Sequence, residues 1–179
     1  MVNITKLRLT QLQTEILRAL FITNGSTINQ RQLALRLNVT QPAIKKALPS
    51  LKKINFIKIQ KDQRLSITLN AENHRVMQLK RIDNLKQIYE SGFIDFLENE
   101  YAGATIILFG SYSRGEDTIN SDIDLAIIGR EEKKLDLKIF EKKLERKINI
   151  NIYQAFNKIN KYLKENLANG ILLIGGFEL

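Results

Sequence analysis

The sequence predicts an α+β protein of two domains, residues 1–72 and residues 73–179. Three observations lead to this prediction. Apolar residues recur with helical spacing through most of the first 55 residues, and a segment of alternating apolar and polar residues follows. Positive charge is concentrated in the first domain. In the second domain, two apolar runs enclose a polar loop that ends in two aspartates.

Three helices are expected between residues 10 and 54. Thr10 can cap the first, with Gln13 as its capping-box partner, and Asn29 with Gln32 repeats the pattern for the second. Thr40 can cap the third after a short turn at residues 38–40. Residues 57–60 and 65–69 then alternate between apolar and polar types around a polar turn, which predicts a β-hairpin.

The third helix carries its polar side chains opposite its apolar face. These include Gln41, Lys45 and Lys52, with Lys46 beside them. Pro49 lies inside this helix and is expected to kink it or to end it early.

Three helices, a three-residue turn and a hairpin resemble a winged helix-turn-helix domain, a family whose third helix enters the DNA major groove while the wing touches phosphate. The resemblance implies contacts to duplex DNA from Gln41, Lys45, Lys46, Lys52, Lys61 and Arg64. Lysines suit phosphate better than base edges, so no sequence preference is predicted. The alternative is a solvated basic face on a domain used for dimerisation. Winged-helix regulators are often dimers, so a homodimer is a further expectation.

Charge distribution supports nucleic-acid binding by the first domain. Residues 1–70 hold 12 Lys and Arg against 2 Asp and Glu, a net charge of +10, whereas residues 71–179 hold 16 against 17, a net charge of −1. Compositional drift from AT-rich coding would spread basic residues along the whole chain. Their concentration in one segment is typical of a surface that binds a polyanion.

A helix is expected to join the domains. Apolar residues recur at three- and four-residue steps through residues 71–99, and Gly92 is expected to divide this segment into two helices. No Gly/Ser/Pro tract is present, so a flexible tether is not predicted. The absence of cysteine and the single histidine, His74, exclude thiolate and histidine-rich metal sites. No apolar run is long enough to span a membrane, and no export signal is evident, which favours a cytoplasmic protein.

The second domain contains the candidate catalytic and metal-binding residues. Residues 104–109 are wholly apolar and predict a buried strand, and residues 122–128 predict a second strand that begins with Asp122 and Asp124. Residues i and i+2 of a strand share a face and lie about 6.6 Å apart, so these carboxylates repel each other unless a cation lies between them. Mg²⁺ suits them because it takes carboxylate and phosphate oxygens as ligands.

The turn between these strands can supply a phosphate site. Gly110 would let a phosphate approach the backbone, Ser111 can donate from its N–H and hydroxyl groups, and Arg114 can neutralise phosphate charge. A metal beside a phosphate site indicates chemistry on a nucleoside triphosphate. The alternative is a plain hairpin with a polar loop.

The segment "GSYSRG" followed by "SDIDLAI" resembles the minimal nucleotidyltransferases of the DNA polymerase beta superfamily, whose signature is Gly-Ser, about ten residues, and Asp-x-Asp. The resemblance covers roughly residues 93–179. It implies a small mixed sheet flanked by helices, Mg²⁺ as cofactor and an NTP substrate, with ATP favoured. It also implies an ATP-binding transferase that can act on a partner protein, including HEPN-type toxins of toxin–antitoxin pairs.

The family's third catalytic carboxylate has no obvious counterpart. The next predicted strand, residues 148–154, places Asn149 and Asn151 on one face, and either one could occupy that position. An amide cannot accept a proton, and general-base help is worth about 10²–10⁴ in rate. Glu145, Glu116 or Asp117 could substitute, although each is expected to be a surface charge.

Two functions remain open at this point. One is an enzyme that transfers NMP, with AMP favoured, to an unidentified acceptor. The other is a DNA-binding transcriptional regulator whose second domain binds a nucleotide without turnover, and the missing carboxylate favours it.

Overall fold

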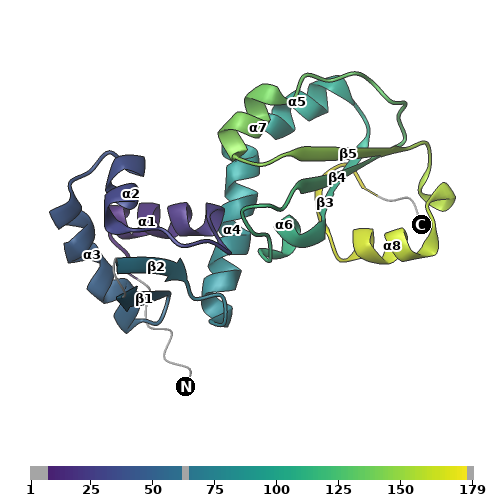
Figure 1. Cartoon of the computed structure of the whole chain (residues 1–179). Helices are drawn as coiled ribbons and strands as arrows, with labels where there is room; N and C mark the ends of the chain where they lie inside the picture. The colour runs from purple at the N-terminus through teal and green to yellow at the C-terminus, as the bar shows by residue number, and fades with distance from the viewer. Residues whose placement is uncertain (1–7, 62–64, 177–179) are drawn as a thin grey trace. The chain divides into compact units, whose positions relative to one another are not determined.

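The computed structural model describes residues 8–61 and 65–176 of the chain (Figure 1). The backbone divides into two compact units, Met1–Val76 and Met77–Leu179, and the division falls in the first turn of helix α4 (His74–Glu90). Helices and small sheets are both present, so the α+β prediction is confirmed.

In the first unit, helices precede a hairpin. The elements are α1 (Gln11–Ile22), α2 (Gln30–Arg36), α3 (Gln41–Lys53), β1 (Ile57–Lys61) and β2 (Leu65–Leu69). Strands β1 and β2 pair antiparallel, and Ile28 adds an isolated bridge to Ile67. Fully buried side chains from each helix and from β2 form the core, namely Ile16, Leu33, Ile44, Leu51 and Ile67.

The predicted helix caps are confirmed. Thr10 with Gln13, and Asn29 with Gln32, form complete capping boxes, and the Thr40 hydroxyl accepts a hydrogen bond from the Ala43 N–H.

Pro49 was expected to kink α3 or to end it early, and the early end was wrong, because the helix continues through Pro49 to Lys53. Pro49 and Lys45 are both exposed, so water can solvate the Lys45 carbonyl that a proline cannot pair. Burial of Leu51 in the next turn stabilises the continuing helix.

In the second unit, helices surround a mixed sheet with the strand order β5-β4-β3-β6. Its remaining elements are α5 (Phe93–Glu100), β3 (Thr105–Phe109), α6 (Gly110–Arg114), β4 (Ile123–Ile128), α7 (Lys138–Leu144), β5 (Ile148–Tyr153), the 3₁₀ turn η1 (Phe156–Lys158), α8 (Lys161–Ala168) and β6 (Ile171–Ile174). Strand β3 runs antiparallel to β4 and β6, whereas β4 and β5 run parallel. Gly92, with φ +77°, separates α4 from α5 as predicted.

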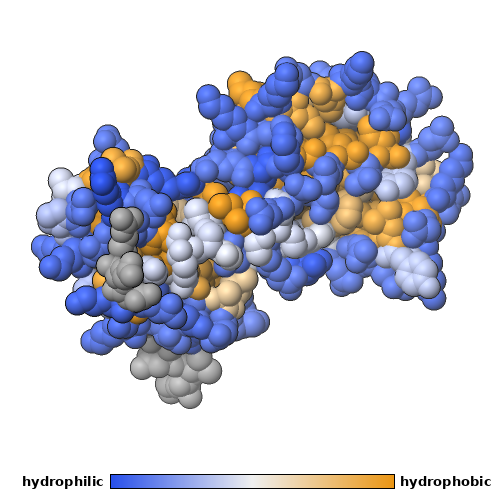
Figure 2. All heavy atoms as spheres, viewed as in Figure 1, coloured by the Kyte–Doolittle hydropathy of each residue, from blue (hydrophilic) through white to orange (hydrophobic). Residues whose placement is uncertain are grey.

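The two faces of this sheet have different cores. On one face, side chains of β3 and β4 pack against α5 and α7, with Phe93, Leu97, Phe140 and Leu144 in the same cluster. On the other face, Ile107, Ala126 and Ile128 pack with Ile159 and Leu167 from the η1–α8 segment, which lies across the sheet from α5 and α7 (Figure 1). Apolar residues also reach the surface of this unit between hydrophilic ones (Figure 2). None of the described helices is long and apolar enough to cross a bilayer.

Candidate functional site

The carboxylate pair lies where β4 begins. Asp122 directly precedes this strand, and Asp124 is its second residue. Asp124 is paired with Phe109, the last residue of β3, and with Asn149, the second residue of β5. Partners in a parallel ladder share a face of the sheet, so Asn149 lies on the same face as the aspartates.

Asn149 contacts both carboxylates. Its Nδ2 group donates to Oδ2 of Asp122 at 3.1 Å and to Oδ1 of Asp124 at 3.4 Å. Asn151, in contrast, is paired with Ala126, two residues farther along β4 than Asp124. The structure therefore places Asn149, rather than Asn151, beside the carboxylate pair.

Two features favour glycine at position 110, the start of α6. The φ angle of Gly110 is +74°, and a Cβ atom there would lie 2.5 Å from Oδ2 of Asp124. Such a separation is far below van der Waals contact, and the atom it would meet belongs to a candidate metal ligand. The carboxylate therefore accounts for the glycine, in addition to the phosphate approach expected from the sequence.

Residues 110–114 form a short helix rather than the loop that the sequence predicted after Ser111. Ser111 is half-buried and follows Gly110 directly, whereas Arg114 lies at the other end of α6. The Arg114 Nε group donates to Oε2 of Glu116 at 2.7 Å, and this pair is exposed. The structure therefore gives Arg114 a carboxylate partner outside the aspartate pair.

Of the suggested substitutes for a third carboxylate, Glu116 and Asp117 bond to other side chains, whereas Glu145 lines a cavity together with Asp122. Glu116 pairs with Arg114, and Glu145 is exposed at the end of α7, where its φ angle is +52°. Asp117 was expected to be a surface charge, but it is only 1% exposed, so that expectation was wrong. Within residues 8–61 and 65–176, no group of three or more His, Cys, Asp or Glu side chains is arranged to hold a metal ion.

The donor set still suits a hard divalent cation. The partly exposed carboxylates of Asp122 and Asp124 face the Asn149 amide. The atoms with which these three groups can bind a metal ion are all oxygens. Mg²⁺ is usually held by one or two carboxylates together with substrate phosphates and water, so two carboxylates are sufficient. The Asn149 N–H groups now occupy the space toward which both carboxylates are directed.

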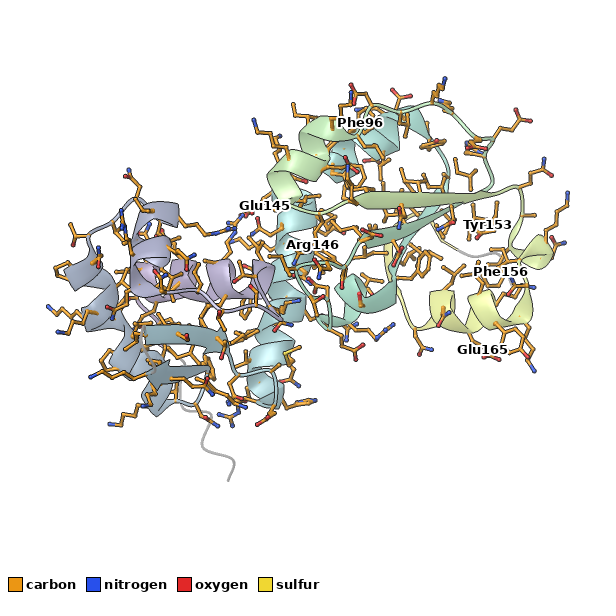
Figure 3. The ribbon with its side chains drawn as sticks, viewed as in Figure 1. Phe96, Glu145, Arg146, Tyr153, Phe156 and Glu165 are labelled. Atoms are coloured by element: carbon orange, nitrogen blue, oxygen red, sulfur yellow. The ribbon has the colours of Figure 1, made fainter. Side chains whose placement is uncertain are left out.

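A cavity of about 510 Å³ opens beside Asp122, between α7 and the segments that precede β4 and β5. It is lined by Ile119, Asn120, Ser121, Asp122, Lys138, Glu141, Lys142, Glu145, Arg146 and Lys147. Figure 3 shows Glu145 and Arg146 between α7 and the start of β5. Glu141 accepts hydrogen bonds from the Lys147 ammonium at 3.1 Å and the Ile148 N–H at 3.2 Å, and these bonds lower its pKa below the ordinary 4.5.

A buried charged cluster, made of Lys80, Asn84, Asp117 and Arg146, lies in the same unit. Lys80 is fully buried, and its ammonium donates both to the Asp117 carboxylate and to the Asp117 carbonyl oxygen. The opposite carboxylate oxygen accepts from Arg146 at 3.2 Å, and Asn84 donates to Oδ1 at 2.7 Å. Burial lowers the pKa of Lys80 below its ordinary 10.5, while the adjacent Asp117 carboxylate acts in the opposite direction.

The sequence contained one signal for this cluster. Val76, Lys80, Asn84 and Ile88 follow at four-residue steps and therefore share one face of α4. All four are buried. The apolar residues of the same helix were a poorer guide to burial, since Ile82 is 64% exposed and Tyr89 is 48% exposed.

Those predicted DNA-contacting residues that the structure describes are exposed in the first unit. Gln41, Lys45, Lys46 and Lys52 project from α3, and Lys61 ends β1. Arg64 lies outside the described residues. A cavity of about 390 Å³ at the starts of α2 and α3 is lined by Asn29, Gln30, Arg31, Gln41 and Leu65.

One comparison with known proteins locates its match in the second unit. The family model for a nucleotidyltransferase domain matches residues 90–174, a range that includes the carboxylate pair. A Methanocaldococcus jannaschii protein provisionally named protein adenylyltransferase MJ0604 is 51% identical over 39 residues, which are 21% of this chain and 39% of that protein. The chain thus matches well under half the length of this relative. A solved Staphylococcus aureus MepR–DNA complex aligns with 51% of this chain and 81% of its own at 19% identity, with a TM-score of 0.38.

The family match and the named relative support a nucleotidyltransferase assignment in general for the second unit. They identify neither an acceptor nor a metal.

Proposed function

We propose that the second unit is a Mg²⁺-dependent nucleotidyltransferase that transfers AMP from ATP to a hydroxyl group of a partner protein. The observation that carries this proposal is the placement of Asp122 and Asp124 on one strand face against the Gly110 turn. The similarity of residues 90–174 to nucleotidyltransferase domains supports it, and the name of the archaeal relative supports adenylyl transfer to protein.

The residues divide the work between phosphate and metal. Asp122 and Asp124 would hold Mg²⁺, which when bound neutralises charge on the phosphates. The backbone at Gly110 and the hydroxyl of Ser111 would hold the phosphates. Arg114 would also bind a phosphate, after giving up its ion pair with Glu116. The Asn149 amide would turn its oxygen toward the cation, because an N–H group cannot face a positive charge.

The acceptor would approach through the cavity beside Asp122. In-line displacement needs the acceptor and the leaving pyrophosphate on opposite sides of the α-phosphorus. Gly110 and Ser111 directly follow β3, whereas the cavity is lined by α7 and by the segments that precede β4 and β5. The acceptor oxygen forms the new bond to the α-phosphorus. The bond between the α-phosphorus and the oxygen that bridges it to the β-phosphate breaks, and pyrophosphate leaves with the electron pair. The acceptor proton passes to water, since Asn149 cannot accept it.

A transfer assay tests this function. The full chain is incubated with α-labelled ATP, Mg²⁺ and candidate partner proteins, of which HEPN-type toxins are the first choice. Label on the partner is expected with the wild type and not with Asp122→Ala. Calorimetry with ATP, with and without Mg²⁺, runs in parallel, and a lack of Mg²⁺-dependent ATP binding would reject the proposal at its first step.

A second candidate function is a DNA-binding regulator that senses a nucleotide without turnover. The observation that favours it is the Asn149 amide where a third carboxylate would assist catalysis. Mg²⁺-dependent ATP binding without transfer to any tested acceptor would select this function over the enzyme.

For the first unit, we propose a winged helix-turn-helix domain that binds duplex DNA. Its order of helices and hairpin supports this fold, and the exposed lysines of α3 support contacts to phosphate. A gel-shift titration of the full chain at increasing salt is the test, because release of counterions makes such binding fall steeply with salt. Binding that does not change with salt would count against phosphate contacts.

A further inference from the structure

The segment between α6 and β4, residues 115–122, connects the proposed phosphate turn to the proposed metal ligands. Asp117 anchors this segment in the interior rather than at the surface, and its side chain is 1% exposed. Gly115 also packs closely against the backbone of α4. A Cβ atom at this position would lie 2.8 Å from the Arg81 nitrogen and from the Met77 carbonyl oxygen. The segment therefore has fixed contacts on both sides of Glu116.

The buried charged cluster reaches all the parts of the candidate site. Asn84 donates to the Tyr112 carbonyl oxygen at 2.9 Å as well as to Asp117, and Tyr112 lies two residues after Gly110. Asp117 lies five residues before Asp122. Arg146, which donates to Asp117, lies three residues before Asn149. One carboxylate thus joins α4 to the backbone segments that carry the phosphate turn, the metal ligands and Asn149.

Stability alone is a weak explanation for such a cluster. Removing charges from water is costly, and replacing a buried ionic group by apolar residues of similar volume is often neutral or stabilising. Charged and directional contacts do, however, select one relative position of the groups they join. A site for Mg²⁺ and phosphate needs such fixed positions, because small displacements of its groups weaken binding.

We infer that Asp117 is a positioning residue that sets the spacing between the Gly110–Ser111 turn, the carboxylate pair and Asn149. This inference rests on the proposed function for its effect on nucleotide binding. It also makes a claim about the free protein, namely that the cluster holds residues 115–122 in one conformation.

The test replaces the charged cluster by apolar residues in the full chain, as Lys80→Met, Asp117→Leu and Arg146→Met together. Stability to denaturant is expected to be kept, while hydrogen exchange of the amides in residues 115–122 rises about tenfold or more. The dissociation constant for Mg²⁺·ATP is expected to rise by about tenfold or more as well. The control variant, Glu100→Gln with Lys133→Gln, removes an exposed ion pair of the same unit and should change neither quantity.

A milder variant covers the case in which the triple variant does not fold. Asn84→Leu removes the side-chain hydrogen bonds to the Tyr112 carbonyl oxygen and to Asp117 but keeps the ion pairs, and a rise of about threefold in both quantities is expected. The inference is overturned if a folded triple variant shows the same amide hydrogen exchange and the same Mg²⁺·ATP affinity as the wild type. If the triple variant unfolds, the same result in Asn84→Leu overturns it. If the wild type itself binds no Mg²⁺·ATP, the proposed function fails, and hydrogen exchange alone decides whether Asp117 positions the segment.

Discussion

The two units of the chain use charged residues in different ways. In the described part of the first unit, the buried polar side chains are neutral, namely Gln13, Thr23, Asn24 and Asn70. In the second unit, Lys80, Asp117 and Arg146 are all buried, and both cations bond to the Asp117 carboxylate. The first unit therefore has an excess of solvated charge, whereas the second has a balanced charge that is partly internal.

This difference determines how much one charge matters. An exposed lysine interacts through water and salt, so it contributes little by itself and acts mainly through the sum of its neighbours. A buried charge depends on a few partners at fixed distances, so its loss leaves those partners unpaired. Single substitutions should therefore have large effects in the second unit and small ones in the first.

The largest effect is expected for Asp117→Asn. Lys80 and Arg146 would lose the carboxylate between them, and breaking a buried ion pair by removing one partner costs about 3–5 kcal/mol. The free energy of unfolding, from denaturant titration of the full chain, is the measurement. Asp124→Asn is the matched control, because it removes the same charge seven residues away at a partly exposed site. A change there within about 0.5 kcal/mol is expected, and equal losses in the two variants would contradict the comparison.

Gly110→Ala should have the next largest effect. A residue other than glycine held at φ +74° costs about 1–3 kcal/mol, and its Cβ would also displace the Asp124 carboxylate. Gly92→Ala separates these two causes, since Gly92 has φ +77° but open space where a Cβ would lie. Both variants should lose stability in denaturant titration. Only Gly110→Ala should weaken Mg²⁺·ATP binding in calorimetry, and an unchanged affinity there would argue against the Asp124 site.

Asn149→Asp tests whether the amide limits turnover. A carboxylate at this position would add a metal ligand and a proton acceptor, so Mg²⁺-dependent AMP transfer should rise by about tenfold or more. Asn151→Asp adds the same charge on the same strand beside Ala126 and should not increase transfer. The measurement is label transfer from ATP to the accepted partner. If wild-type transfer is already fast and neither variant gains, another residue accepts the proton, and Glu145 is the first to test.

These sites differ in how far the sequence alone could predict them. The caps at Thr10, Asn29 and Thr40 are local patterns, and the structure confirms them residue by residue. The choice between Asn149 and Asn151 could not be made, because it depends on the register between β4 and β5, which are separate in sequence. Asp117 was also misplaced, since its partners lie 29 and 37 residues away and no local pattern marks it as internal.

A smaller effect is expected for Lys45→Ala with Lys46→Ala in the first unit. Removing one lysine that binds a phosphate should reduce the slope of log affinity against log salt by about 0.9, so affinity should fall severalfold at moderate salt. Lys133→Ala with Lys134→Ala removes the same charge from the second unit. Gel-shift titration at several salt concentrations compares the two pairs. An equal decrease of affinity in both would show that net charge, rather than the α3 surface, determines binding.

The smallest effect concerns acid stability and Glu141. Hydrogen bonds from Lys147 and from the Ile148 N–H lower the pKa of this carboxyl in the folded chain below the ordinary 4.5. Between the folded pKa and 4.5, the unfolded chain binds more protons than the folded chain, so stability rises with pH across that window. This contribution is complete above pH 4.5 and is lost as the pH falls through the folded pKa.

Glu141→Gln should therefore flatten the dependence of unfolding free energy on pH below 4.5. Glu165→Gln, at an exposed position on α8 (Figure 3), should leave it unchanged. An identical pH dependence in wild type and Glu141→Gln would mean that the link from α7 to the start of β5 contributes nothing through its charge.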